Sequence, residues 1–163
     1  MPGHPDEFDK LFNQNYDNDK TSYFRLSESK NNQSYNVEFG KNIILQEKGE
    51  VVIIAVGTTL KAVLEASSNL DVTIIYCTTI KPFDFSSIKK FLNKKILIVE
   101  PFYSGPILTN IHRELSNLSG NFSMIGVPNN FINKYGNKDD IDKMIGLDSE
   151  AIKKRILRII NEK

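Results

Sequence analysis

The chain has 163 residues, which favours one compact domain with a sizeable buried core. Its 40% hydrophobic and 25% charged residues are ordinary for a globular protein, and its net charge of +1 argues against a nucleic-acid surface. No apolar run approaches the ~20 residues that cross a bilayer, and the single cysteine excludes an internal disulfide and fits a reducing compartment. We therefore expect a cytoplasmic protein that binds neither nucleic acid nor membrane.

The first 40 residues predict a helix, a strand and a linker. Proline and two acidic residues at positions 5–7 suit a first helical turn, and apolar residues follow at helical spacing. Residues 21–26 contain aromatic and β-branched side chains, which favour a strand. A polar, aperiodic stretch rich in Ser and Asn then indicates a linker, which we place at residues 28–40. Residues 1–27 are thus expected to end one domain, and residues 41–163 to form the next.

After the linker, short apolar runs alternate with segments of helical length. Strands are expected at residues 42–46, 51–56, 72–77, 96–99 and 123–127, and helices at residues 60–68, 85–93 and 107–118. This alternation predicts parallel strands joined by right-handed crossovers. The turn at residues 48–50 predicts a hairpin between the first two strands, so the first strand becomes an antiparallel edge. The expected fold is a three-layer α/β/α structure whose mixed five-stranded sheet has four parallel strands.

The end of the chain predicts an amphipathic helix. Asp148 or Ser149 can cap it, and Ile152 and Ile156 begin an apolar face that Ile159 and its neighbour continue. The remaining positions are rich in Lys and Arg. Such a basic amphipathic helix can bind a membrane or a partner, but a terminal helix packed on the sheet explains the same pattern, and we favour the packed helix.

Ligands of doubly wound sheets bind beyond the carboxyl ends of the strands. Thr58 and Thr59 follow the second strand, where they can cap the next helix and offer N–H groups to an anion. Glu100 and Ser104 lie in the turn after the fourth strand. A lone carboxylate such as Glu100 is more often a structural hydrogen-bond acceptor than a catalyst. Cys77, which ends the third strand, is expected to be a buried, inert thiol.

Four segments carry a resemblance to a known family. They are Tyr-Asn-Val-Glu-Phe-Gly-Lys at residues 35–41, Gly-Glu-Val-Val-Ile-Ile-Ala-Val-Gly-Thr at 49–58, Thr-Ile-Lys-Pro-Phe-Asp at 79–84, and Ile-Val-Glu at 98–100. In this order they resemble the C-terminal domain of the transketolase superfamily, which includes transketolases, deoxyxylulose-phosphate synthases and the β subunits of 2-oxoacid dehydrogenases. Residues 1–27 resemble the last helix and strand of the pyrimidine-binding domain that precedes it.

The resemblance implies a division of labour within a larger enzyme. Members of the superfamily transfer or cleave a two-carbon ketol or acyl unit with thiamine diphosphate and Mg²⁺, which upstream domains bind. The implied role of this chain is non-catalytic: it would support a homodimer and the assembly with upstream thiamine-binding domains or a thiamine-binding subunit. We expect the chain alone to bind no cofactor and to be inactive.

Several positions depart from the family pattern. Members that use sugar phosphates tend to carry an arginine for the substrate phosphate about where Glu28 stands, and a carboxylate there would repel a phosphate. Arg25 matches an arginine of the synthase-like pattern but lies three residues earlier, so Arg25 and Glu28 are the candidate substrate-binding residues. Phe102 stands where members often have a histidine, and Pro106 replaces a second glycine, which fixes φ and removes an N–H.

Two alternatives stay open. A stand-alone flavodoxin-like module would bind a nucleotide or an anion through Thr58, Thr59 and Ser104, although no glycine-rich phosphate loop follows a strand. A structural remnant that has lost its catalytic partners would also tolerate Glu28 and Phe102. The residues therefore predict a fold and a family, and leave the substrate and the branch of the superfamily open.

Overall fold

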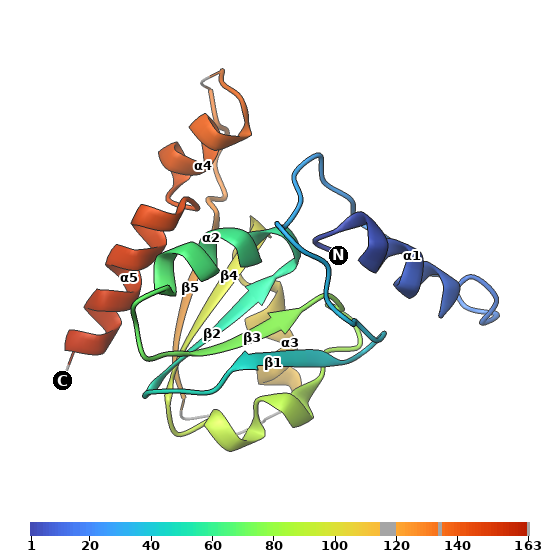
Figure 1. The fold of residues 1–163 in the computed structure, drawn as a ribbon, viewed down its shortest axis with the longest axis horizontal. Helices are drawn as coiled ribbons and strands as arrows, with labels where there is room; N and C mark the ends of the chain where they lie inside the picture. Colours follow the sequence, from blue (N-terminus) through green and yellow to red (C-terminus); the bar gives the residue numbers. More distant parts are fainter. Residues whose placement is uncertain (115–119, 134, 163) are drawn as a thin grey trace.

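A mixed five-stranded sheet forms the centre of the computed structural model, which describes residues 1–114, 120–133 and 135–162 (Figure 1). The strands are β1 (Asn42–Gln46), β2 (Val51–Val56), β3 (Thr73–Cys77), β4 (Lys95–Tyr103) and β5 (Asn121–Val127), and the helices are α1 (Pro5–Asn13), α2 (Leu60–Ser67), α3 (Pro106–Glu114), α4 (Lys138–Ile145) and α5 (Ser149–Asn161). The strands pair in the order β1-β3-β2-β4-β5. β2 to β5 are parallel, and β1 is an antiparallel edge strand.

Helices cover both faces of the sheet. Successive strand residues face opposite sides, so Ile53 of β2 packs in the core under α2 and α5, whereas Ile54 packs in the core under α3. Every residue of β2 and β3 is buried, which explains why these strands are continuous apolar runs in the sequence. The predicted three-layer α/β/α fold is therefore confirmed.

The first strand is an edge strand as predicted, but the predicted hairpin is wrong. β3 lies between β1 and β2, and β1 pairs with β3. The connection from β1 to β2 passes over the start of β3, where the Thr73 hydroxyl bonds to both the N–H and the carbonyl of Lys48. At a φ of +60°, Gly49 lies so near this strand that an added Cβ would overlap the carbonyl oxygen of Asp71. Glycine at this position therefore allows the short connection between β1 and β2 to pass close over the start of β3.

The strand predicted at residues 21–26 is wrong. These residues are irregular, because no strand of the described chain pairs with them and a lone extended segment forms no ladder. The helix predicted at residues 107–118 is described as α3 up to Glu114, and residues 115–119 lie outside the described part of the chain.

The helix predicted at residues 85–93 is also wrong. The structure has two short 3-10 turns there, at Phe85–Ser87 and Lys89–Phe91. The carbonyl of Asp84 accepts hydrogen bonds from the Ser87 hydroxyl and the Asn42 side-chain amide. Because side chains take the acceptor that would start an α-helical ladder, the segment winds more tightly.

The C-terminal region contains one helix that was not predicted and one that was. α4 begins at a reciprocal cap, in which Asn137 and Asp140 each bond the other's backbone N–H. In α5, Ile152 and Ile156 are buried against the α2 side of the sheet, so the packed interpretation of this basic helix is confirmed. Within the described residues, no helix combines the length and the apolar character that crossing a bilayer requires.

Candidate functional site

The N-terminal segment of the chain packs on the carboxyl end of the sheet (Figure 1). The backbone at Gly3 lies so near the end of β2 that an added Cβ would stand 2.7 Å from the carbonyl oxygen of Gly57. Glycine is the residue that allows this approach. The predicted domain boundary at residues 28–40 stays a prediction, but the residues before it are in direct contact with the sheet.

A fully buried carboxylate fixes this segment. Glu7 of α1 accepts hydrogen bonds from the N–H of Gly3 at 2.9 Å, the N–H of Tyr35 at 3.0 Å and the hydroxyl of Tyr76 at 2.6 Å. Burial, supported by the hydrogen bond to Glu7, raises the pKa of Tyr76 above its ordinary value, so the phenol stays protonated and donates. Sequence reasoning missed this role, because an acidic residue in a first helical turn carries no sign of burial.

Asn31 extends the network into the predicted linker. Its amide nitrogen donates to the Gly57 carbonyl and to the Tyr76 hydroxyl, both at 3.2 Å. Its amide oxygen accepts from the N–H of Lys61 at 3.2 Å, and its own N–H donates to the Gly3 carbonyl at 2.7 Å. The linker is thereby fixed to the first turn after β2.

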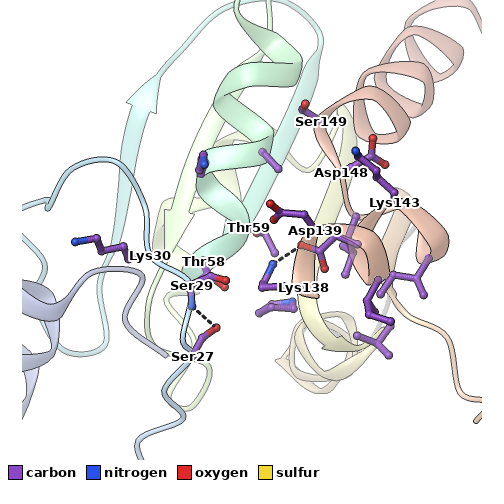
Figure 2. A pocket seen from close by; sticks show the side chains of 18 of the residues that line it. Ser27, Ser29, Lys30, Thr58, Thr59, Lys138, Asp139, Lys143, Asp148 and Ser149 are labelled. Atoms are coloured by element: carbon purple, nitrogen blue, oxygen red, sulfur yellow. Dashed lines mark hydrogen bonds and ion pairs between the residues drawn. The ribbon is translucent and has the colours of Figure 1, made fainter. Parts of the chain in front are cut away.

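A hollow of about 600 Å³ lies between residues 25–30, the turn after β2 and α4 (Figure 2). We call it the polar hollow. Arg25, Thr58 and Thr59 line it, so the structure brings three of the predicted site residues together. The lining includes Arg25 and four lysines, but also four carboxylates, and Lys138 pairs with Asp142. These balanced charges give the polar hollow no clear preference for an anion or a cation.

The two threonines after β2 have different surroundings. The Thr59 hydroxyl accepts from the N–H of Val56 at 3.0 Å and lies 3.1 Å from the carbonyl oxygens of Val56 and Val99. α2 begins there without a side-chain cap, so the predicted cap at Thr59 is not formed. Thr59 instead ties β2 to β4. Thr58 is half-buried in the wall of the polar hollow.

Glu100 has the geometry of a structural acceptor. Its buried carboxylate accepts from the N–H of Gly105 at 2.7 Å and of Ile107 at 3.0 Å, on either side of Pro106, which has no N–H. Burial raises the pKa of Glu100, and the two hydrogen bonds oppose that shift without cancelling it. The carboxylate therefore organises the turn that leads into α3.

The other predicted site residues lie elsewhere. Ser104 is exposed and lines a separate depression beside Lys81 and Asn110, away from Thr58. Glu28 is exposed and lines neither this depression nor the polar hollow. The structure therefore does not bring together the three side chains that a flavodoxin-like module would use.

The Thr-Ile-Lys-Pro-Phe-Asp segment at residues 79–84 forms hydrogen bonds with the backbone just before and at the start of β1. The Thr79 hydroxyl accepts from the N–H of Gly40 at 3.0 Å, and the Asp84 carboxylate accepts from the N–H of Asn42 at 3.1 Å. Partial burial raises the pKa of Asp84, but hydrogen bonds from Ser86, Asn42 and Ser87 outweigh it and leave the pKa below its ordinary value. This segment thus has a structural role that its sequence alone did not reveal.

Comparison with known sequences identifies the family. A sequence model described as "Transketolase, C-terminal domain" matches residues 40–152. The chain belongs to this family. A relative of this transketolase C-terminal domain, an uncharacterized 33.6 kDa protein in the fasciation locus of Rhodococcoides fascians, is 31% identical over 161 residues, which cover 96% of this chain and 52% of that protein.

Two synthases match less of their own length. The 1-deoxy-D-xylulose-5-phosphate synthase of Clostridium tetani is 27% identical over 77% of this chain and 22% of the synthase. The synthase of Thermotoga maritima is 30% identical over 86% of this chain and 23% of the synthase. The transketolase C-terminal domain therefore spans about half of the Rhodococcoides protein and about a fifth of each synthase.

Solved structures confirm the fold. A split-gene transketolase, in the form of an inactive β4 tetramer, has a TM-score of 0.68 at 16% identity, covering 80% of this chain and 47% of that one. The transketolase of Campylobacter jejuni has a TM-score of 0.55 at 14% identity, covering 73% of this chain and 18% of that one.

The described residues of this transketolase C-terminal domain do not gather the ligands that a metal-bound diphosphate requires. Among the residues that the structure describes, no three His, Cys, Asp or Glu side chains converge as metal ligands. The lysines of the polar hollow are matched by carboxylates, and Glu100 is committed to backbone N–H groups. Burial raises the pKa of the Cys77 thiol to about 12, which makes it a poor nucleophile.

Proposed function

We propose that this domain is the non-catalytic assembly part of a thiamine-diphosphate-dependent enzyme that transfers a two-carbon ketol or acyl unit. Its membership of the transketolase C-terminal domain family supports this class of enzyme. Thiamine diphosphate and Mg²⁺ would be bound by a thiamine-binding part, either upstream in a longer chain or in a separate subunit. The complete enzyme would be a cytoplasmic homodimer.

The observation that carries this proposal is an exposed aromatic surface on the N-terminal segment. Phe12 and Tyr16 stack with ring centres 5.8 Å apart, and Phe12 lies 6.1 Å from Phe24. We call Phe12 and Tyr16 the aromatic surface; Phe12 is 44% exposed and Tyr16 is 66% exposed. Exposed apolar patches mark contact surfaces. Because these residues resemble the end of a pyrimidine-binding domain, the remainder of that domain is the partner they fit.

The hydrogen bonds of Glu7 and Asn31 attach the segment that carries the aromatic surface to the sheet. Glu7 holds α1 against Tyr76 of β3, and Asn31 holds the following segment against Gly57. A partner docked on the aromatic surface would therefore be held against the sheet as well. A fixed bridge of this kind is what an assembly domain requires.

The split-gene transketolase supports an arrangement with separate subunits. Its β4 tetramer is inactive, and the present chain corresponds to 47% of its length. The Rhodococcoides relative is likewise about twice as long as the matched part. We therefore propose that the missing half of such a subunit includes the rest of the pyrimidine-binding domain.

Binding to the thiamine-binding part tests the proposal. Phe12→Ser and Tyr16→Ser are each expected to weaken the measured affinity at least about tenfold, because aromatic anchors dominate interface energies. Ile160→Ser is a matched control, since Ile160 is 43% exposed on α5, at the far side of the molecule from α1 (Figure 1). The proposal fails if the thiamine-binding part does not bind the chain, or if the control weakens binding as much as Phe12→Ser.

A further inference from the structure

A second hollow, of about 720 Å³, lies beside the N-terminal segment at the ends of β3 and β4. We call it the apolar hollow. Its apolar walls include Leu11, Phe24, Phe39, Ile80, Phe102 and Pro106. The volume falls within the range of about 300–1,000 Å³ that small-molecule sites occupy, and its place at the carboxyl ends of parallel strands is where α/β sheets bind ligands.

The charged groups of the apolar hollow have one sign. Arg25 and Lys81 line it, and among the described residues no carboxylate does. Neither cation forms an ion pair within the described part of the chain. The Arg25 guanidinium lies 5.7 Å from the ring centre of Phe102, which keeps it beside the apolar wall. The apolar hollow is therefore apolar and positive. It shares Arg25 with the polar hollow, whose lining also includes carboxylates.

A residue with an unpartnered, buried hydroxyl also lines the apolar hollow. Thr78 is 2% exposed, and its side-chain oxygen has no hydrogen-bond partner in the part of the chain that the structure describes. The neighbouring Thr79 hydroxyl, by comparison, accepts from the N–H of Gly40. Buried hydroxyls almost always have a partner, so the one at Thr78 points to a polar atom that a ligand supplies.

We propose that the apolar hollow is a binding site for a small apolar carboxylate. The hydrocarbon part packs against Phe24 and Phe102, Arg25 and Lys81 attract the anionic group, and the Thr78 hydroxyl donates to it. Each of these features is needed for the assignment: the apolar walls select the body of the ligand, and the unpaired cations select its charge. All of these residues belong to this chain, so the chain without the thiamine-binding part is the protein to use in the binding test.

Titration of the chain with 3-phenylpropanoate, followed by NMR of the backbone amides, tests the proposal. We expect saturable binding with shifts centred on Thr78, Lys81 and Phe102. The neutral 3-phenylpropanamide lacks the charge and inorganic phosphate lacks the apolar body, so each should bind at least about tenfold more weakly. No saturable binding, or equal binding of either comparison compound, overturns the proposal.

Variants locate the site. Lys81→Gln and Thr78→Val are each expected to weaken binding of 3-phenylpropanoate about tenfold, since each removes a polar contact to a charged group. Thr78→Val keeps the side-chain volume and removes a hydroxyl that has no partner in the described chain, so its melting temperature should not fall. Lys61→Gln, which removes a lysine from the polar hollow, should leave the affinity unchanged. Unchanged affinity in both Lys81→Gln and Thr78→Val overturns the assignment.

Discussion

Removal of the Glu7 carboxylate should release the N-terminal segment from the sheet. Glu7→Ala leaves three donors without their acceptor: the N–H of Gly3, the N–H of Tyr35 and the hydroxyl of Tyr76. An unpaired buried donor costs about 1–3 kcal/mol, and the two backbone groups regain water once the segment moves away. We therefore expect the free energy of unfolding to fall by about 3–5 kcal/mol. This is less than the sum of three lost hydrogen bonds to a carboxylate at about 1.5–3 kcal/mol each, because two of the donors regain water.

Urea unfolding followed by far-ultraviolet circular dichroism measures this loss. For a chain of this size the loss corresponds to a fall in melting temperature of about 6–20 °C. Limited proteolysis adds a local measure, since cleavage within the first 40 residues should precede cleavage of the sheet. Glu65→Ala, which removes an exposed carboxylate from α2, is the matched control and should change stability by less than about 0.5 kcal/mol.

A double-mutant cycle with Tyr76→Phe separates the network from general damage. Tyr76 donates to Glu7 and accepts from Asn31, so Tyr76→Phe should cost about 1.5–3 kcal/mol by itself. Because Tyr76 and Glu7 share one hydrogen bond, their losses should be coupled by at least about 0.5 kcal/mol. Strictly additive losses, or an unchanged unfolding midpoint in Glu7→Ala, would refute this reasoning.

Three further predictions follow from the ionisable groups. The pKa of Asp84 is lowered from 3.8 in the folded chain. The parent chain should therefore be more stable than Asp84→Asn above that pH, and this difference in the free energy of unfolding should shrink as the pH falls below it, as measured by urea midpoints. Burial raises the pKa of Glu100 above 4.5, so the stability of the parent chain relative to Glu100→Gln should rise on acidification; a fall would show that the two hydrogen bonds outweigh burial. Burial raises the pKa of Cys77 to about 12, so iodoacetamide at about pH 8 should label the thiol in urea but not in the native chain, as mass spectrometry would show.

The layers of the fold were predictable because burial leaves a direct signal in the sequence. β2 and β3 are buried on both faces, and a parallel strand in that position must be a continuous apolar run. The pairing of β1 was not predictable in this way. Its apolar run fits an edge beside either neighbour, and the choice depends on Gly49 passing close to the backbone of Asp71.

The candidate site was less predictable than the fold. The partners of Glu7 come from residues 3, 35 and 76, so its burial appears only when distant parts of the chain meet. Thr58 and Thr59 were singled out because they follow a strand, and Arg25 because it matches an arginine of the synthase-like pattern. The structure places all three at one hollow. α4 had a readable signal, since Asn137 and Asp140 have the spacing of a reciprocal helix cap.

Turnover with thiamine diphosphate is the most direct test of the assembly role. It should be measured on this chain alone, on the thiamine-binding part alone and on the two together, with a ketol or 2-oxoacid donor and Mg²⁺ present. We predict activity in the mixture and none in either part, and lower activity when the chain carries Phe12→Ser. Turnover by the 163 residues alone, or full activity of the thiamine-binding part without them, would contradict the assembly role.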